Sequence, residues 1–179
     1  MSSRNLNNLS DLFFAIGDAI LAADIGVLVG NYNDFDGTVG DSTVLIEIEN
    51  TQAGVRSQDG RKSHIVTVTL HAVVGRWRKH ANLEAANLAT LLERLATDNR
   101  WGLPSVQCGL PDRLSSGPTM FEGGQGGYEA WGVNFQQFIS IGAVLLEDPV
   151  MEFRAPPLVA RSWEVTGFDD PGQYQQLEV

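Results

Sequence analysis

The chain has 179 residues, of which 43% are hydrophobic and only 19% are charged, so it can bury a core of its own. Twelve basic residues stand against 22 acidic ones, and this balance argues against a groove that clamps nucleic acid through its phosphates. The formal net charge of −10 has two explanations: it keeps the protein soluble, or it forms a surface past which DNA slides without binding. The one cysteine, Cys108, excludes a disulfide bond within the chain.

The N-terminus carries no pattern typical of a targeting segment. Residues 1–24 lack the basic start, the unbroken apolar run and the small-residue cleavage site of a signal peptide. No stretch reaches the eighteen or so apolar residues that are needed to span a bilayer. We therefore expect a protein that is made in the cytoplasm.

The first predicted element is an amphipathic helix over residues 9–23, whose apolar stripe faces the core. Asn8 and Ser10 are candidate N-caps, and Asp11 lies close to the positive end of the helix dipole. The apolar positions at helical spacing are Leu9, Phe13, Ile16 and Ile20. Residues 30–42 combine Gly, Asn and Asp, and we expect them to form turns.

Two strands are predicted next, paired as an antiparallel hairpin. Residues 43–49 alternate in polarity, which indicates a strand with one face that is exposed to solvent or belongs to an interface. That face carries Leu45, Glu47 and Glu49. Residues 64–75 are rich in β-branched side chains, and the polar residues 50–63 are expected to connect the strands as an extended loop.

Residues 80–98 predict a second, longer helix. A leucine stripe is surrounded by alanines, and the charges of Glu84 and Arg94 match the helix dipole. The stripe consists of Leu88, Leu91, Leu92 and Leu95. The Gly-Leu-Pro sequence after Trp101 ends the helix.

The remainder of the chain is predicted to contain two strands and two long irregular segments. Residues 105–108 form a short strand, and residues 109–127, with six glycines and two prolines, form a long loop. Residues 128–146 begin with a strand of about a dozen residues that has one apolar face. Prolines punctuate residues 148–179, which we expect to form an arm.

These elements predict an α+β fold with a mixed or antiparallel sheet of about four strands, flanked by two main helices. We expect one domain over residues 1–147, which includes the long glycine-rich loop. A proline-containing C-terminal arm over residues 148–179 follows it.

The three histidines do not form a metal site by their spacing. His64 and His71 are an odd number of residues apart on one strand, so they point to opposite faces. His80 lies at a helix start, and no cluster of Cys, Asp or Glu completes a coordination shell. We expect no bound metal.

Three other patterns were weighed as chemical sites. Asp34, Asp36 and Gly37 have the spacing of a calcium loop, but carboxylates are missing at its first and last positions, so an acidic turn is favoured. The glycines of residues 123–127 lack the Lys-Ser/Thr of a phosphate loop. Cys108 lacks the sequence context of a known nucleophile. We expect no catalytic residue, no cofactor and no enzymatic activity.

The candidate interface is the basic loop. Arg56, Arg61 and Lys62 are three of the twelve basic residues and fall within seven positions on an acidic molecule. Residues 109–127 and 148–179 are further candidates, since long loops on a small domain are often functional. A hairpin tip that is merely solvated remains the alternative for the basic loop.

The order of the elements resembles that of the phage tail terminator family, the tail-completion proteins of long-tailed bacteriophages. The resemblance covers about residues 9–145. It rests on DLFFAIGDAI, the pair TVLIEIE and HIVTVTLHAVV, the helix LEAANLATLLERLA, and YEAWGVNFQQFISIG with its W-x-V-x-F core.

The resemblance implies a structural virion protein without catalytic residues. Subunits of this family form a homohexameric ring that caps the tail tube, ends its polymerisation and joins the tail to the neck. The implied partners are further copies of the chain, the tail-tube protein and a neck or head–tail connector protein. DNA would pass through the lumen without specific binding. The alternatives are a neck stopper, a tail-tube subunit or, from a different class, a small hydrolase.

Overall fold

The computed structural model describes residues 5–124, 126–145, 158–160 and 174–176. The chain divides into two compact units, residues 1–146 and 147–179. In the second unit, β6 (Leu158–Ala160) and β7 (Tyr174–Gln176) pair in antiparallel fashion. The rest of the arm expected at the C-terminus lies outside the described residues.

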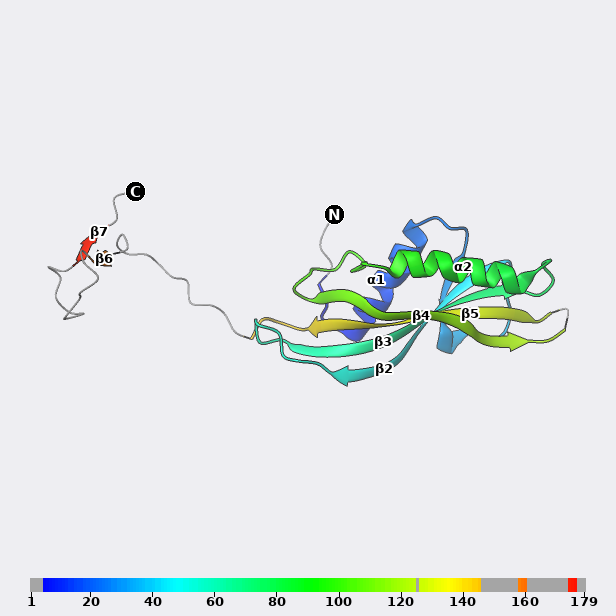
Figure 1. Cartoon of the computed structure of the whole chain (residues 1–179). Helices are drawn as coiled ribbons and strands as arrows, with labels where there is room; N and C mark the ends of the chain where they lie inside the picture. Colours follow the sequence, from blue (N-terminus) through cyan, green and yellow to red (C-terminus); the bar gives the residue numbers. More distant parts are fainter. Residues whose placement is uncertain (1–4, 125, 146–157, 161–173, 177–179) are drawn as a thin grey trace. The chain divides into compact units, whose positions relative to one another are not determined.

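The first unit contains two helices and a five-stranded mixed sheet, which confirms the predicted α+β class with one strand more than expected (Figure 1). Its elements are α1 (Leu9–Ala22), β1 (Leu28–Asn31), the 3-10 helix η1 (Tyr32–Asp34), β2 (Ser42–Ala53), β3 (Lys62–Gly75), α2 (Ala81–Ala96), β4 (Cys108–Glu122) and β5 (Tyr128–Ile141). The strand order is β1-β2-β3-β5-β4. β1 runs parallel to β2, and the other neighbours are antiparallel.

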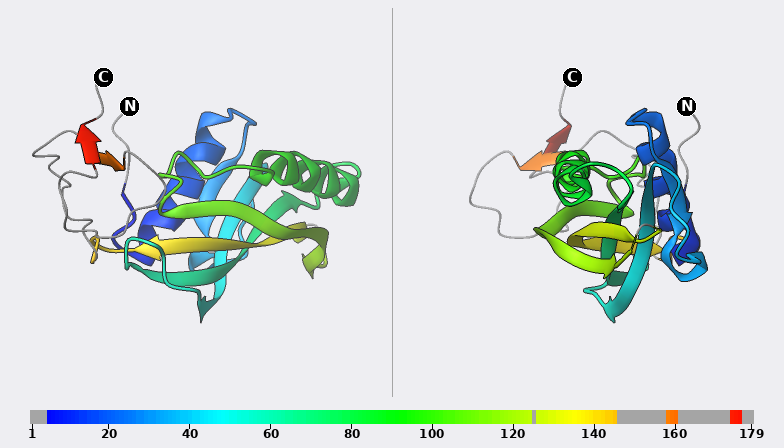
Figure 2. Two further views of the ribbon diagram at one scale, coloured as in Figure 1. Left: turned by 60° about the vertical axis from the view of Figure 1, so that its left-hand side comes forward. Right: turned by 90° about the vertical axis from the view of Figure 1, so that its right-hand side faces the viewer.

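Both helices lie on the same face of the sheet (Figure 2). Between helices and sheet, one core forms from alternate residues of the strands, because successive strand side chains point to opposite faces. Its fully buried members include Ile16, Ile46, Val68, Leu92 and Phe135. Neither α-helix lies on the opposite face, which is called the open face below. There Tyr32 of η1, Phe35 and Val39 pack against Leu45, Val73 and Ala130.

The first helix begins where the sequence predicts. The carboxylate of Asp11 accepts hydrogen bonds from the backbone N–H groups of Asn7 and Asn8, at 2.8 and 2.9 Å. Asn8 is thereby the N-cap, and two N–H groups at the helix start are satisfied. Leu12 and Ile20 are fully buried against the sheet. No helix in the described part of the chain is long and apolar enough to cross a membrane.

The predicted hairpin is confirmed, but its strands are longer than expected. The ladder between β2 and β3 continues past a bulge between Ile48 and Asn50 and ends at the pair Ala53↔His64. The connecting loop is therefore confined to residues 54–61. Polar residues at the end of β2 join the ladder because backbone pairing with β3 does not depend on their side chains.

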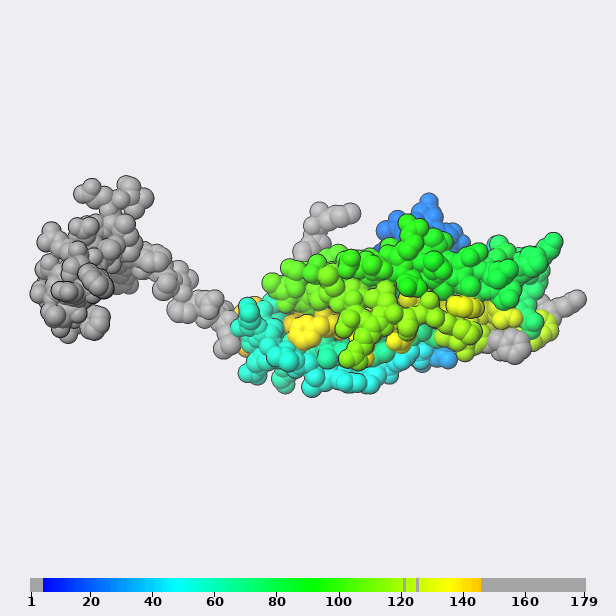
Figure 3. Space-filling model, viewed as in Figure 1, coloured from blue at the N-terminus to red at the C-terminus, as the bar shows by residue number. Residues whose placement is uncertain are grey.

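The glycine-rich loop predicted over residues 109–127 is wrong, because most of this segment forms the edge strand β4. Three irregularities in its pairing with β5 accommodate its glycines and prolines, and an edge strand tolerates residues without a backbone N–H. Figure 3 shows β4 along the side of the unit that faces the viewer, below α2. The turn segment 30–42 likewise contains the end of a strand, β1, at the other edge of the sheet.

The buried face of α2 is shifted relative to the predicted leucine stripe. Leu88 and Leu92 are buried, whereas Leu91 is 45% exposed. Alanines occupy the remaining buried positions, which are Ala81, Ala85, Ala89 and Ala96. Their small side chains let the helix pack closely against β3 and β5, so the alanine side of the helix faces the sheet.

This shift predicts opposite outcomes for two neighbouring substitutions. Leu92→Asp would bury an unpaired carboxylate at a cost of roughly 3 kcal/mol or more, a large part of a typical stability of about 5–15 kcal/mol. Leu91→Asp should cost less than about 1 kcal/mol, because its carboxylate reaches water. Urea denaturation of both variants checks this, and equal destabilisation would contradict the assigned helix face.

Candidate interaction surfaces

The centre of the open face is polar. Glu47 and Glu49 of β2, Thr69 and His71 of β3, and Asn134 of β5 all point to this side, because the intervening residues fill the core. Glu47 lies opposite Thr69, and Thr69 lies opposite Asn134. The strand face expected from Glu47 and Glu49 therefore belongs to a larger polar cluster that spans four strands.

His71 is held on three sides. Its Nε2 lies 2.8 Å from an Oε2 of Glu47, and its Nδ1 lies 3.1 Å from the hydroxyl of Thr119 on β4. The ring of Tyr32 stacks on the imidazole with 4.8 Å between the centroids. Since a carboxylate only accepts hydrogen bonds, Nε2 carries the proton in the neutral ring, and Thr119 then donates to Nδ1.

The second part of the cluster centres on Glu49. Its Oε1 accepts hydrogen bonds from the hydroxyl of Thr69 and from Nδ2 of Asn134, the latter at 3.1 Å. Asn134 Nδ2 also donates to the Thr69 hydroxyl at 2.7 Å. These bonds orient the carboxylate, while the side chain remains exposed. Within the described part of the chain, no Lys or Arg forms an ion pair with Glu47 or Glu49.

The sheet is hollowed beside this cluster at Gly117, whereas the Thr119 side chain fills the space next to the facing Gly132. Gly117 of β4 pairs with Gly132 of β5. A Cβ on Gly132 would lie 2.4 Å from the Thr119 methyl group, whereas a Cβ on Gly117 would meet nothing within 4 Å. The resulting hollow has a volume of about 300 Å³. Its lining includes Glu49, Thr69, His71, Ser115, Thr119 and Asn134.

The hollow is rich in hydrogen-bond acceptors, so it suits a cationic group better than an anion. The order Thr119 hydroxyl, His71 imidazole, Glu47 carboxylate is also one that activates hydroxyl nucleophiles in hydrolases. Here the imidazole side chain is only 7% exposed and the Tyr32 ring stacks on it, which favours a structural role. The sequence did not reveal this contact, because Thr119 falls in the segment predicted as a loop.

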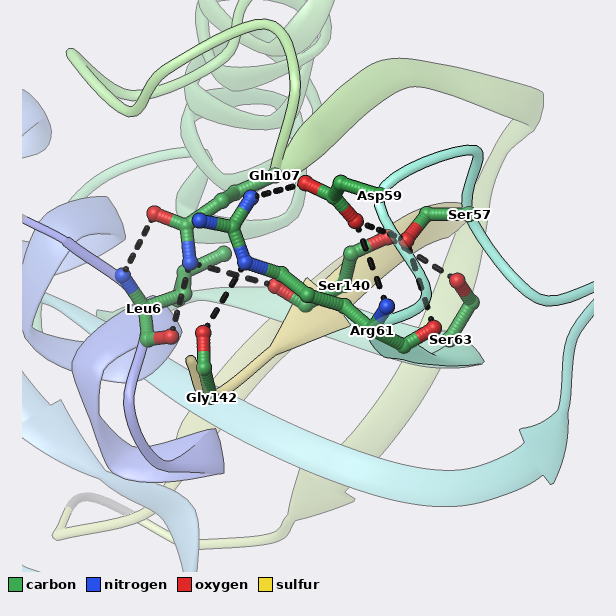
Figure 4. A network of polar contacts seen from close by, with 8 residues as sticks. All are labelled: Leu6, Ser57, Asp59, Arg61, Ser63, Gln107, Ser140 and Gly142. Carbon is green, nitrogen blue, oxygen red and sulfur yellow. Dashed lines mark hydrogen bonds and ion pairs between the residues drawn. The ribbon is translucent and has the colours of Figure 1, made fainter. Parts of the chain in front are cut away.

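The basic loop is a separate surface, and its three predicted residues have different surroundings. The Arg61 side chain is 13% exposed and spans from the Asp59 carboxylate, at 2.5 Å, to the Gly142 carbonyl oxygen, at 2.9 Å (Figure 4). It therefore fastens the loop to the end of β5. Arg56 and Lys62 are exposed, and neither side chain has a hydrogen bond or ion pair with the described residues.

Hydrogen bonds within this loop also lower the pKa of Asp59. The hydroxyl of Ser57, the backbone N–H of Arg61 and the charge of Arg61 together hold the pKa of the Asp59 carboxyl below its usual value of 3.8. The ionised form of Asp59 therefore stabilises the folded loop.

The structure does not bring the three histidines and Cys108 together into a chemical site. His64 and His71 lie on opposite faces of β3, and His80 precedes α2 in the left-handed backbone region. Among the described residues there is no group of three or more His, Cys, Asp or Glu side chains that could hold a metal ion. Burial raises the pKa of the Cys108 thiol to about 12, so the thiol is protonated at neutral pH.

Comparison with models of known protein families gives no match for this chain, and comparison with curated proteins gives no significant match.

Gly132 tests how tightly the polar cluster is packed. Gly132→Ala should destabilise the fold by about 1–3 kcal/mol, because the new methyl group displaces Thr119 and breaks its bond to His71. Thr119→Ser removes the methyl group in question and keeps the hydroxyl. Thermal unfolding of the two single variants and the double variant should show that Thr119→Ser recovers part of the loss. Strict additivity would contradict the proposed contact.

The lowered pKa of Asp59 predicts acid loosening of the basic loop. The stabilisation is present above the unfolded pKa near 3.8 and is lost as the pH falls through the lower folded value. Hydrogen exchange of the Ser57 and Gly60 amides, which are bonded within the loop, should therefore lose protection below pH 3.8. Asp59→Asn should show weak protection at neutral pH already. Constant protection in the parent protein across this range would contradict the prediction.

Proposed function

We propose that this protein is a structural virion component that forms a ring at the end of a phage tail tube. The ring ends polymerisation of the tube and joins the tail to the neck. The observation that carries the proposal is a sheet with both α-helices on one face, built in the order helix, long hairpin, helix and two long strands. The resemblance to tail terminators rests on this order with a glycine-rich loop in the place of β4.

Several features of the described residues support assembly as the mode of action. The open face presents a polar cluster with a shallow hollow beside it. Large apolar side chains are exposed on α1, β1 and α2, and they include Leu21, Leu28 and Leu91. Exposed apolar side chains of this size are typical of surfaces that become buried between proteins when they gather in one region.

The proposal also accounts for the charge of the chain. A ring around a DNA channel must let the phosphates pass without holding them, and an acidic molecule meets that need. The partners in this proposal are further copies of the chain, the tail-tube protein and a neck or head–tail connector protein. The site of action is the tail and neck region of the virion.

A neck stopper is the second candidate, because it too forms a ring of one chain between head and tail. A tail-tube subunit fits less well, since two helices cover one sheet face here, whereas a tube subunit should be richer in strands. A small hydrolase is favoured only by the connection of Thr119 to His71 and Glu47.

The decisive test uses a phage from which this protein has been deleted. A tube subunit adds to an end that repeats the same head-to-tail surface, and such growth does not stop by itself. Cells infected by the deletion phage should therefore accumulate overlong tails that are not attached to filled heads. Electron microscopy measures tail length, and adding the purified protein to finished tails should restore joining.

Other outcomes of the deletion identify the alternatives. Unattached tails of normal length would contradict the terminator function and favour a neck stopper. The absence of tails would indicate a tube or initiator subunit.

A further inference from the structure

The hollow on the open face has the chemistry of a guanidinium site. One oxygen of Glu49 is occupied by Thr69 and Asn134, which leaves the other oxygen available in a fixed orientation. The hydroxyl oxygens of Ser115 and Thr119 add further acceptors along the same wall. A planar guanidinium with several N–H donors matches a carboxylate with neighbouring hydroxyls better than a compact ammonium does.

No cation of the same unit fills this hollow. The described residues contain no ion pair to Glu49, and the ion-paired arginines Arg61, Arg76 and Arg78 have other carboxylates as partners. The acceptors therefore lack a positive partner, although their bonds to Thr69 and Asn134 hold Glu49 in place.

The tip of the hairpin carries an exposed cation, Arg56, which has no ion pair with the described residues; Lys79 and Arg113 are also exposed without one. Arg56 is in the loop between β2 and β3, next to Val55, which is 83% exposed. Arg56 cannot reach the hollow of its own chain along the strand. The four residues from Glu49 to the end of β2 at Ala53 alone span about 13 Å, and the loop extends further.

We propose that Arg56 of one copy inserts into the hollow of a neighbouring copy and pairs with its Glu49, with Lys62 strengthening the contact from the rim. The proposal rests on the ring assembly proposed above and names the surfaces that build it. Charge complementarity between a basic tip and an acidic hollow on an otherwise acidic molecule selects a second copy as the partner.

The two surfaces lie at different places on the chain, so the contact is heterologous. Each copy has one tip and one hollow. In an open chain of copies, the first copy therefore keeps a free hollow or tip, and the last copy keeps the other. Such contacts continue from copy to copy until the rotation closes a ring. An isolated exposed ion pair contributes little, but closure makes every copy contribute two contacts at once.

A charge swap tests this contact in the full-length protein. Arg56→Glu and Glu49→Arg should each weaken self-association by at least about tenfold, because both place like charges across the interface. The double variant R56E/E49R restores opposite charges and should associate like the parent. An equimolar mixture of the two single variants should also assemble, with the two variants alternating. Native mass spectrometry resolves all of these species by mass.

Matched controls separate charge from damage to the fold. Lys79→Glu and Glu122→Arg change the same charges at exposed sites away from the tip and the hollow, and should leave assembly intact. Glu49→Gln keeps hydrogen-bonding groups beside Thr69 and should weaken association less than Glu49→Arg. Circular dichroism verifies that each variant is folded.

The outcomes distinguish this inference from the proposed function. Rings that form equally well from every single variant would overturn the Arg56–Glu49 contact, while the deletion phage could still show overlong tails. A parent protein that stays monomeric at its highest soluble concentration would also overturn the contact. If the single variants bind only the tail-tube protein more weakly, the occupant of the hollow is that protein and not a second copy. Rescue by the charge swap together with normal tail length in the deletion phage would keep the contact and reject the terminator function.

Discussion

The ladder between β3 and β5 is the constraint on which the rest of the unit depends. It pairs fourteen residues of each strand, from Lys62↔Ile141 to Gly75↔Tyr128, without a shift in register. Because side chains alternate, this register places Val68 and Phe135 in the core and, at the same time, places Thr69 and Asn134 side by side on the open face. A slip by one residue would exchange the two faces, so the fold and the polar cluster are specified together.

Irregularity is confined to the outer part of the sheet. All three irregularities of β4, and the bulge of β2, lie on the neighbours of the central pair. Edge strands that twist and kink make poor templates for uncontrolled pairing with other chains. The irregular edge strand β4 is therefore a poor site for pairing with another chain.

The elements that could be predicted from the sequence are those with a strong pattern of their own. The helix stripe of α1 and the alternation of β2, β3 and β5 are local properties, and the structure confirms them. β4 could not be predicted, because its glycines and prolines form a strand only when β5 supplies the partner. Gln137 shows that the alternation predicts burial even for a polar residue, because it shares the parity of Phe135 and Ile139. It is fully buried, and its side-chain amide is hydrogen-bonded to Trp101 and Gly109. The role of Arg61 depends on Gly142, eighty-one residues away, and no local pattern contains that contact.

Gly117 and Gly132 are paired across β4 and β5, but different constraints act on them: folding constrains Gly132, and the shape of the hollow constrains Gly117. Gly132 is favoured by the fold, since a side chain at this position meets the methyl group of Thr119. Gly117 faces open space, so a methyl group there would be neutral for folding and would only begin to fill the hollow. Substitutions at position 117 would therefore leave the monomer intact while altering what the hollow accepts. Under the contact proposed above, we expect residues 117 and 56 to vary together, so that each lineage matches its own copies and excludes those of its relatives.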